Sequence, residues 1–194
     1  MNLSWLIRSQ SLVTLASGMI YPYYLLFLKN LGNSYSKYGL AFAVFTISSA
    51  LVSQWLAPRL DRYSQRMLIA SSMGMMAAML AFPWVMSYSV VLLLQLLMGI
   101  CNAMQKMSER QLLADYTIPG GRGAAIGNYH FWTTVASGIA VVLGGYLIDW
   151  LTINVLFYFS ALVYAASAWA VWRMQKADRG KESVQAQKTK SVNG

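Results

Sequence analysis

The stretch that decides the fold is residues 67–105, MLIASSMGMMAAMLAFPWVMSYSVVLLLQLLMGICNAMQ, which holds no Lys, Arg, Asp or Glu. A membrane-spanning helix needs roughly 20 apolar residues, so this stretch is long enough for two crossings. Four shorter uncharged stretches, each long enough for one crossing, lie at 9–28, 38–58, 123–148 and 150–172. The sequence therefore predicts six transmembrane helices.

The predicted spans lie within these uncharged stretches. They are 11–28, 38–57, 67–86, 89–107, 124–148 and 151–172. Helices are expected rather than a β-barrel, because runs such as Val90–Leu94 do not alternate polar and apolar residues. The chain is 57% hydrophobic and 11% charged, whereas an average soluble domain is about 25% charged. We therefore predict an all-α membrane protein in which residues 1–175 form a six-helix transmembrane domain.

Basic residues are distributed unevenly over the two sides of the predicted bundle. With six crossings both termini share one side, and that side holds 13 of the 15 Lys and Arg residues; only Lys29 and Lys37 fall opposite. Because basic loops stay in the cytoplasm, we expect both termini to be cytoplasmic and the protein to lie in a bacterial plasma membrane. This topology explains the net charge of +9 without a nucleic-acid partner. The polar, basic tail at 176–194 is expected to be disordered.

Polar residues recur at helical spacing within the predicted spans, which is typical of a cavity or of helix contacts. The residues that we expect to line a solute cavity are Tyr21, Tyr24, Gln95, Asn102, His130 and Thr134. Small and hydroxylated residues such as Thr134 equally suit helix packing. His130, the only histidine, is either a proton-binding site or a neutral hydrogen-bonding residue.

The short segment between the second and third spans is dense in charge and reads APRLDRYSQRM at 57–67. It resembles the signature loop of the major facilitator superfamily, Gly-x-x-x-Asp-Arg-x-Gly-x-Arg-Arg, which joins that family's second and third helices. Asp61, Arg62 and Arg66 fall on charged positions, and small residues stand at the two glycine positions. With the order of spans and loops, the resemblance covers roughly residues 11–172.

The resemblance implies that this charged segment closes the cytoplasmic side of a carrier. The cytoplasmic gate predicted in this way comprises Arg59, Asp61, Arg62, Arg66, Glu109 and Arg110. A simpler interpretation is that the arginines only set the topology. The family's fourth helix often carries an arginine where this chain has Gln95, which speaks against proton-driven antiport.

Members of this family normally have twelve helices in two six-helix halves, and this chain supplies one half. We therefore expect a transporter subunit, not an enzyme, which moves a small, amphipathic solute by alternating access as a homodimer. The alternatives are a non-transporting partner or regulatory subunit that pairs with another half, and an N-terminal fragment of a full-length carrier. The expected partners are membrane lipid, the solute and a second six-helix unit. No cofactor, metal ion or nucleic acid is expected.

Overall fold

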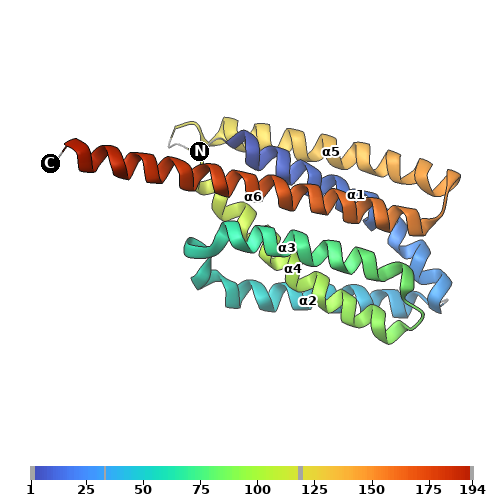
Figure 1. Ribbon diagram of the computed structural model, residues 1–194. Coiled ribbons are helices and arrows are strands. Elements are labelled where there is room, and N and C mark those ends of the chain that lie inside the picture. Colours follow the sequence, from blue (N-terminus) through green and yellow to red (C-terminus); the bar gives the residue numbers. More distant parts are fainter. Residues whose placement is uncertain (1–2, 33, 118–119, 193–194) are drawn as a thin grey trace.

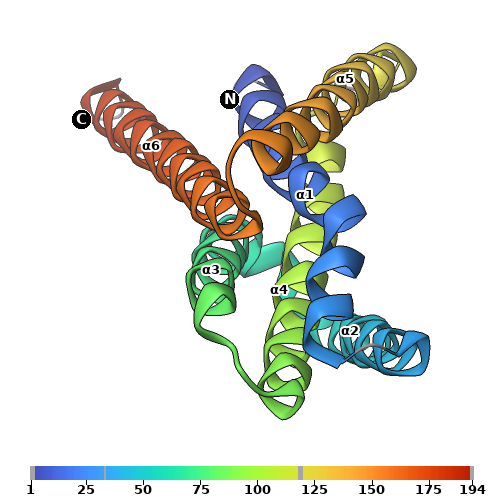
Figure 2. The same cartoon turned by 90° about the vertical axis from the view of Figure 1, so that its right-hand side faces the viewer.

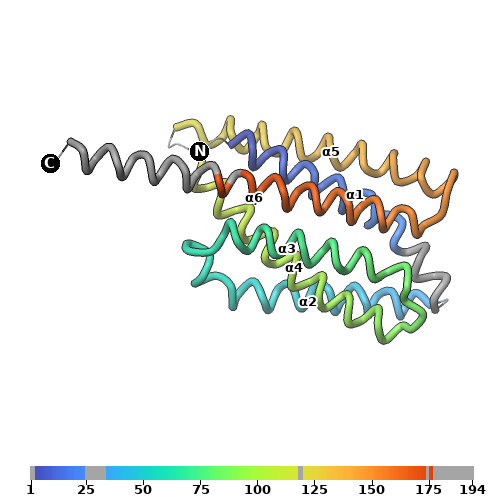
Figure 3. Tube along the Cα trace, viewed as in Figure 1, coloured from blue at the N-terminus to red at the C-terminus, as the bar shows by residue number. Residues whose placement is uncertain are grey.

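The computed structural model describes residues 3–32, 34–117 and 120–192, with side chains described except at 25–32, 174 and 177–192. The long helices are α1 (Leu3–Gly32), α2 (Tyr35–Leu56), α3 (Leu60–Ala81), α4 (Tyr88–Asp115), α5 (Arg122–Trp150) and α6 (Ile153–Val192), shown in Figures 1 and 3. Two 3-10 turns, η1 (Ala57–Arg59) and η2 (Phe82–Trp84), flank α3. No strand occurs in the described part of the chain, so the all-α prediction is confirmed.

The helices differ from the predicted spans mainly at their ends. α1 begins at Leu3 instead of residue 11, and α4 continues to Asp115 instead of 107. The predicted loop between the second and third spans is helical, because η1 leads directly into α3. Charged residues mark where a chain leaves the bilayer, but Lys, Arg and Glu are good helix formers and do not end a helix. α3 instead ends early, at the turn that contains Pro83.

The C-terminal segment continues α6 in the structure, and its expected disorder stays a prediction. α6 continues to Val192, while residues 193 and 194 of the predicted tail lie outside the described residues. The segment is rich in Lys, Gln and Ala as well as being polar. Its composition therefore favours a helix by local propensity even where no apolar face requires one.

The six helices pack as two related groups of three (Figures 1 and 2). α1 packs along α5 and α6, α4 packs along α2 and α3, and α3 lies against α6. Exchanging the first three helices with the last three, in order, reproduces the five most extensive helix pairs. This is the internal repeat expected within one half of a twelve-helix transporter. It places α1 and α4 in the middle of the bundle, with α2 and α5 at its edges.

The apolar core lies where the two groups meet. Its largest fully buried side chains include Tyr164 and Phe157 of α6 and Phe82 of η2. The rings of Phe82 and Phe157 stack with centroids 5.1 Å apart, and the Tyr24 ring of α1 meets Phe82 edge-on at 5.7 Å. Aromatic packing therefore holds α1, α6 and the η2 turn at the end of α3 against each other.

Four helical segments in the described part of the chain are long and apolar enough to cross a membrane. They are Tyr35–Trp84, Tyr88–Asp115, Arg122–Trp150 and Ile153–Arg173. The first of these contains both α2 and α3, and α1 is not among them. Six crossings and the cytoplasmic orientation of the termini therefore stay predictions.

Candidate functional site

Two polar contacts join α1 to α4 in the middle of the bundle. In the second half of α1, the Tyr24 hydroxyl accepts a hydrogen bond from Gln95 Nε2, and the two residues are only 6% and 4% exposed. Near the beginning of α1, Gln105 Nε2 donates to Gln10 Oε1 over 2.8 Å. The Ser71 hydroxyl of α3 donates to Gln105 Oε1. We call these five residues the α1–α4 seam; their hydrogen bonds allow polar groups to be buried between the two groups of helices.

Two further residues of α4, Gly99 and Asn102, face α2. Asn102 Nδ2 donates to Ser49 Oγ over 3.0 Å. A Cβ atom on Gly99 would lie 1.8 Å from Ser48 Oγ and 2.5 Å from the carbonyl oxygen of Phe45. The absence of a side chain at Gly99 therefore lets the backbones of α2 and α4 approach closely.

α5 presents a second polar stripe, but to the outside. His130 and Thr134 are both exposed. A Cβ atom on Gly127 or Gly138 would meet nothing within 4 Å. These four residues recur every three or four positions and share one side of the helix, which we call the open α5 face. At these two glycines, no other helix of the described chain lies against the open α5 face.

Two of the six expected cavity residues meet, and the other four are spread over the bundle. Tyr24 and Gln95 pair inside the α1–α4 seam. Tyr21 is 41% exposed, and its ring meets Phe45 of α2 edge-on at 6.1 Å. Asn102 lies against α2, while His130 and Thr134 belong to the open α5 face. A role for any of them in solute transport stays a prediction.

The charged segment between α2 and α3 is held by aromatic rings. The Arg59 guanidinium lies 4.2 Å from the centroid of the Trp55 ring and donates to the Trp55 carbonyl oxygen over 3.0 Å. Arg62 and Arg66 lie 5.6 and 5.8 Å from the centroid of the Tyr63 ring. Asp61 is exposed in the first turn of α3, where a carboxylate interacts favourably with the helix dipole.

The two α4 residues of the predicted gate lie elsewhere. Glu109 Oε2 is 3.1 Å from Lys106 Nζ, and the hydroxyl of Tyr129 on α5 lies beside the Glu109 carboxylate. Arg110 is exposed. Among the described residues, no ion pair joins this group to the charges of the α2–α3 turn. The gate stays a prediction, and its two parts are separate within this chain.

Sequence reasoning missed part of the polar interior. It did not single out Gln10, Ser71 or Gln105, although a buried amide in an apolar span is a signal for such a contact. It also missed the Ser9 and Ser167 hydroxyls, which lie 3.0 Å apart and join α1 to α6. Gln105 directly precedes Lys106, and it is not among the residues whose helical spacing singled out Gln95 and Asn102.

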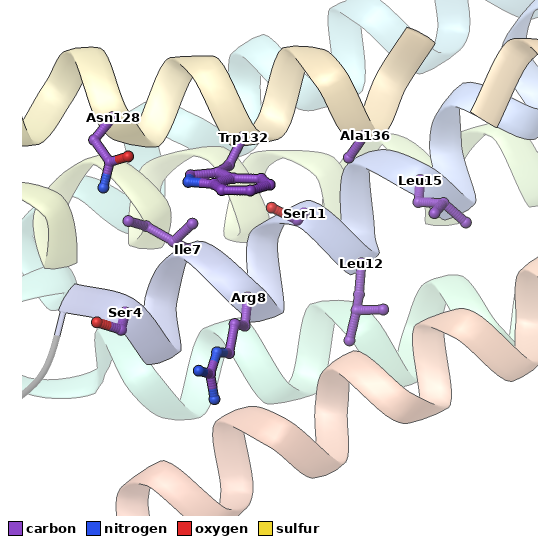
Figure 4. Close-up of a pocket in the computed structure, with 9 residues that line it drawn as sticks. All are labelled: Ser4, Ile7, Arg8, Ser11, Leu12, Leu15, Asn128, Trp132 and Ala136. Carbon is purple, nitrogen blue, oxygen red and sulfur yellow. The ribbon is translucent and has the colours of Figure 1, made fainter. Parts of the chain in front are cut away.

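A groove of about 580 Å³ runs between the first halves of α1 and α5. Figure 4 shows Ser4, Arg8, Ser11 and Leu15 along α1, beside α5; the Ser11 side chain points toward α5, whereas the Arg8 side chain points away from it. The α5 wall consists of Asn128, Trp132 and Ala136, which are spaced one helical turn apart. None of the residues expected to line a solute cavity borders this groove.

The described residues do not gather three His, Cys, Asp or Glu side chains in a group that could hold a metal ion. The polar groups that the structure brings together in the α1–α4 seam are amides and hydroxyls, which act by hydrogen bonding.

Comparison with known proteins agrees with this arrangement. The sequence pattern of the Major Facilitator Superfamily matches residues 7–193. YitZ, an uncharacterized MFS-type transporter of Bacillus subtilis (strain 168), is 42% identical over 153 residues, which make up 78% of this chain and 93% of YitZ. The relative is therefore also a half-size chain. A helical, apolar chain that matches the family over nearly its whole length belongs to the Major Facilitator Superfamily, and it is a membrane transporter protein rather than an enzyme.

Proposed function

We propose that this chain is one half of a carrier, and that two copies pair to move a small solute across the membrane by alternating access. In this proposal both termini are cytoplasmic, six helices cross the bilayer, and the membrane is a bacterial plasma membrane. The solute passes between the two copies, where amide, hydroxyl and aromatic side chains favour a neutral or amphipathic molecule over a strongly charged one. The size of the chain and its membership of the family support this reading.

The open α5 face is the observation that carries the proposal. His130 and Thr134 are exposed there, and polar side chains are costly to place against lipid. Gly127 and Gly138 leave room for another helix to approach closely, as small residues do at helix contacts in membranes. A second copy would cover both the polar groups and the glycines. A two-fold axis supplies the same surface from each copy, so one chain is sufficient.

The charged turn between α2 and α3 fits the same proposal. Asp61, Arg62 and Arg66 are exposed, and no ion pair occupies them within the described residues. In the proposed carrier they latch the cytoplasmic side when the two copies close, and a network of several charges contributes more than isolated surface pairs. Gln10, Tyr24, Gln95 and Gln105 hold each copy rigid during this movement.

The first test is the assembly state of the purified chain in lipid nanodiscs. The proposal expects a protein mass of twice 21.6 kDa. Gly127→Leu fills the open α5 face, and we expect it to shift the particles towards monomers. Ile139→Phe adds bulk to another exposed side of α5, about a third of a turn away, and serves as the matched control. A monomeric native protein, or equal dimer fractions in the two variants, would contradict the pairing.

Flux into proteoliposomes tests transport, with ethidium as an amphipathic probe and glucose as a neutral one. We expect native protein to move at least one of them and Gly127→Leu to lose that flux together with the dimer. Asp61→Asn should keep the dimer and slow the flux, because only the latch loses its charge. Unchanged flux in Asp61→Asn would refute the latch. A dimer without any flux would favour the non-transporting partner subunit.

A further inference from the structure

The groove between α1 and α5 changes in polarity along its length. Ser4 of α1 lies at one end, level with Asn128 of α5, and Arg8 lies one turn further along, level with Trp132. Leu15 and Ala136 lie further along the same two helices. From Arg8 to Leu15 the helix rises about 10 Å. Most of the polar lining therefore lies near the beginning of the helices and most of the apolar lining one to two turns deeper, with Ile7 and Ser11 as exceptions.

The two helices hold this register because they touch just beyond the groove. A Cβ atom on Gly18 would lie 3.0 Å from the Cβ of Ala140 and 3.3 Å from the carbonyl oxygen of Ser137. Close packing at Gly18 fixes the depth at which the groove ends. The polar and apolar residues of the two walls consequently stay level with each other.

The positive charge of Arg8 is available at the mouth of the groove. The Arg8 side chain is exposed, and its guanidinium lies 5.7 Å from the centroid of the Trp5 ring. The ion pair found in the described part of the chain is Lys106–Glu109, on α4. The guanidinium thus faces outward with no described carboxylate to neutralise it, and its planar donors match the geometry of a phosphate.

We propose that this groove binds an anionic phospholipid, with the phosphate at Arg8 and the upper part of one acyl chain along Leu12, Leu15 and Ala136. The order of groups along the groove is that of one lipid leaflet: the uncharged polar residues Ser4 and Asn128 at the end, then Arg8 level with Trp132, then mainly aliphatic side chains. Tryptophan is enriched at the membrane–water interface. A volume of about 580 Å³ accommodates a headgroup and part of a chain. The site depends on membrane insertion, which the family establishes, and not on the proposed solute transport.

Anionic lipid is favoured over a soluble phosphate because most of the groove wall is apolar. Ile7, Leu12, Leu15 and Ala136 offer nothing to a small hydrophilic anion. One exposed arginine attracts a free anion only weakly in water, whereas burial of acyl carbons adds a favourable contribution for each methylene group. The affinity is therefore expected to require both the phosphate and the chain.

Native mass spectrometry of the purified protein, released from micelles with equal phosphatidylglycerol and phosphatidylcholine, tests the site. We expect one phosphatidylglycerol to be retained preferentially by the native chain. Arg8→Gln should reduce that preference roughly fivefold, the effect of one basic residue near an anionic surface. Arg173→Gln is the matched control, because Arg173 is also exposed and lies 4.5 Å from the centroid of the Trp169 ring, but on α6.

A second variant tests the shape of the groove independently of the charge of Arg8. Ser11→Phe fills the groove while Arg8 is kept, and we expect it to lower retention of phosphatidylglycerol as well. Millimolar glycerol 3-phosphate should displace none of the bound lipid. Equal losses in Arg8→Gln and Arg173→Gln would show a diffuse basic surface and overturn the site. Displacement by glycerol 3-phosphate, or full retention in both Arg8→Gln and Ser11→Phe, would also overturn it.

Protection of the buried Cys101 thiol from maleimide shows that each variant is folded.

Discussion

Gly99 of α4 and Gly127 of α5 lie within long apolar helices, and their surroundings are opposite. A Cβ atom on Gly99 would overlap Ser48 and approach the backbone oxygen of Phe45 to 2.5 Å. A Cβ atom on Gly127 would meet nothing within 4 Å. The first glycine is needed for packing inside the chain. The second leaves a surface that the described residues of this chain do not use, which is where a partner helix can fit.

The polar side chains of these helices also differ in whether they are buried within the chain or exposed. In the α1–α4 seam, Gln95 bonds Tyr24 and Gln105 bonds Gln10, so the amides are buried and have partners. On the open α5 face, His130 and Thr134 are exposed. Because both kinds of residue lie in apolar helices, the difference is what the proposed pairing of two copies through α5 would produce.

The largest expected effect comes from adding a methyl group to each glycine. Gly99→Ala forces α2 away from α4, because the Phe45 carbonyl oxygen belongs to the backbone and cannot rotate away. We expect a loss of about 3 kcal/mol or failure to fold. Gly127→Ala should leave the fold intact or stabilise α5 by up to about 1 kcal/mol. Unfolding by SDS titration, followed by maleimide labelling of Cys101, measures both. Similar midpoints for the two variants would remove the contrast between the two surfaces.

An intermediate effect is expected within the α1–α4 seam. Gln105 bonds both Ser71 and Gln10, whereas Gln10 Nε2 is buried without a partner among the described residues. Gln105→Leu should therefore destabilise the protein by about 1–2 kcal/mol, since it leaves the Gln10 amide unpaired. The Ser71 hydroxyl keeps its bond to the Leu68 carbonyl oxygen. Gln10→Leu should cost about half as much, because it also removes an unpaired donor.

The same SDS titration compares these two variants with the native protein and with Gln10→Leu/Gln105→Leu, which completes a double-mutant cycle. The double variant should be less destabilised than the sum of the single variants, as is usual for residues in one network. Additive losses, or a greater loss in Gln10→Leu, would show that the seam does not work as the structure describes.

Sequence patterns predicted the helices well because charge and apolar length act locally. The span predicted at 89–107 lies wholly within α4, which continues to Asp115 because the charged residues after 105 are good helix formers. The spacing of His130 and Thr134 correctly placed them on one face. Spacing does not reveal which helix a face will meet, because that depends on the rotation and tilt of the neighbouring helix.

The polar interior shows this limit most clearly. Tyr24 and Gln95 were expected to line one cavity, and the structure pairs them with each other inside one copy. Gln105 was passed over, and it is the residue that links three helices. A residue's partner is fixed by tertiary packing over roughly a hundred residues of separation, such as that between Gln10 and Gln105, and local periodicity carries no information about it.

The smallest expected effect separates two adjacent threonines of α5. Thr133 is buried and its hydroxyl donates to the Tyr129 carbonyl oxygen over 2.9 Å, whereas Thr134 is exposed on the open α5 face. Thr133→Val should cost about 0.6 kcal/mol in SDS unfolding, the average for a hydrogen bond inside a membrane protein. Thr134→Val should change the stability of one copy by less than about 0.5 kcal/mol. The order should reverse when the dimer fraction in nanodiscs is measured, because only Thr134 faces a partner. If Thr133→Val alters pairing more than Thr134→Val does, the partner surface lies elsewhere than on the open α5 face.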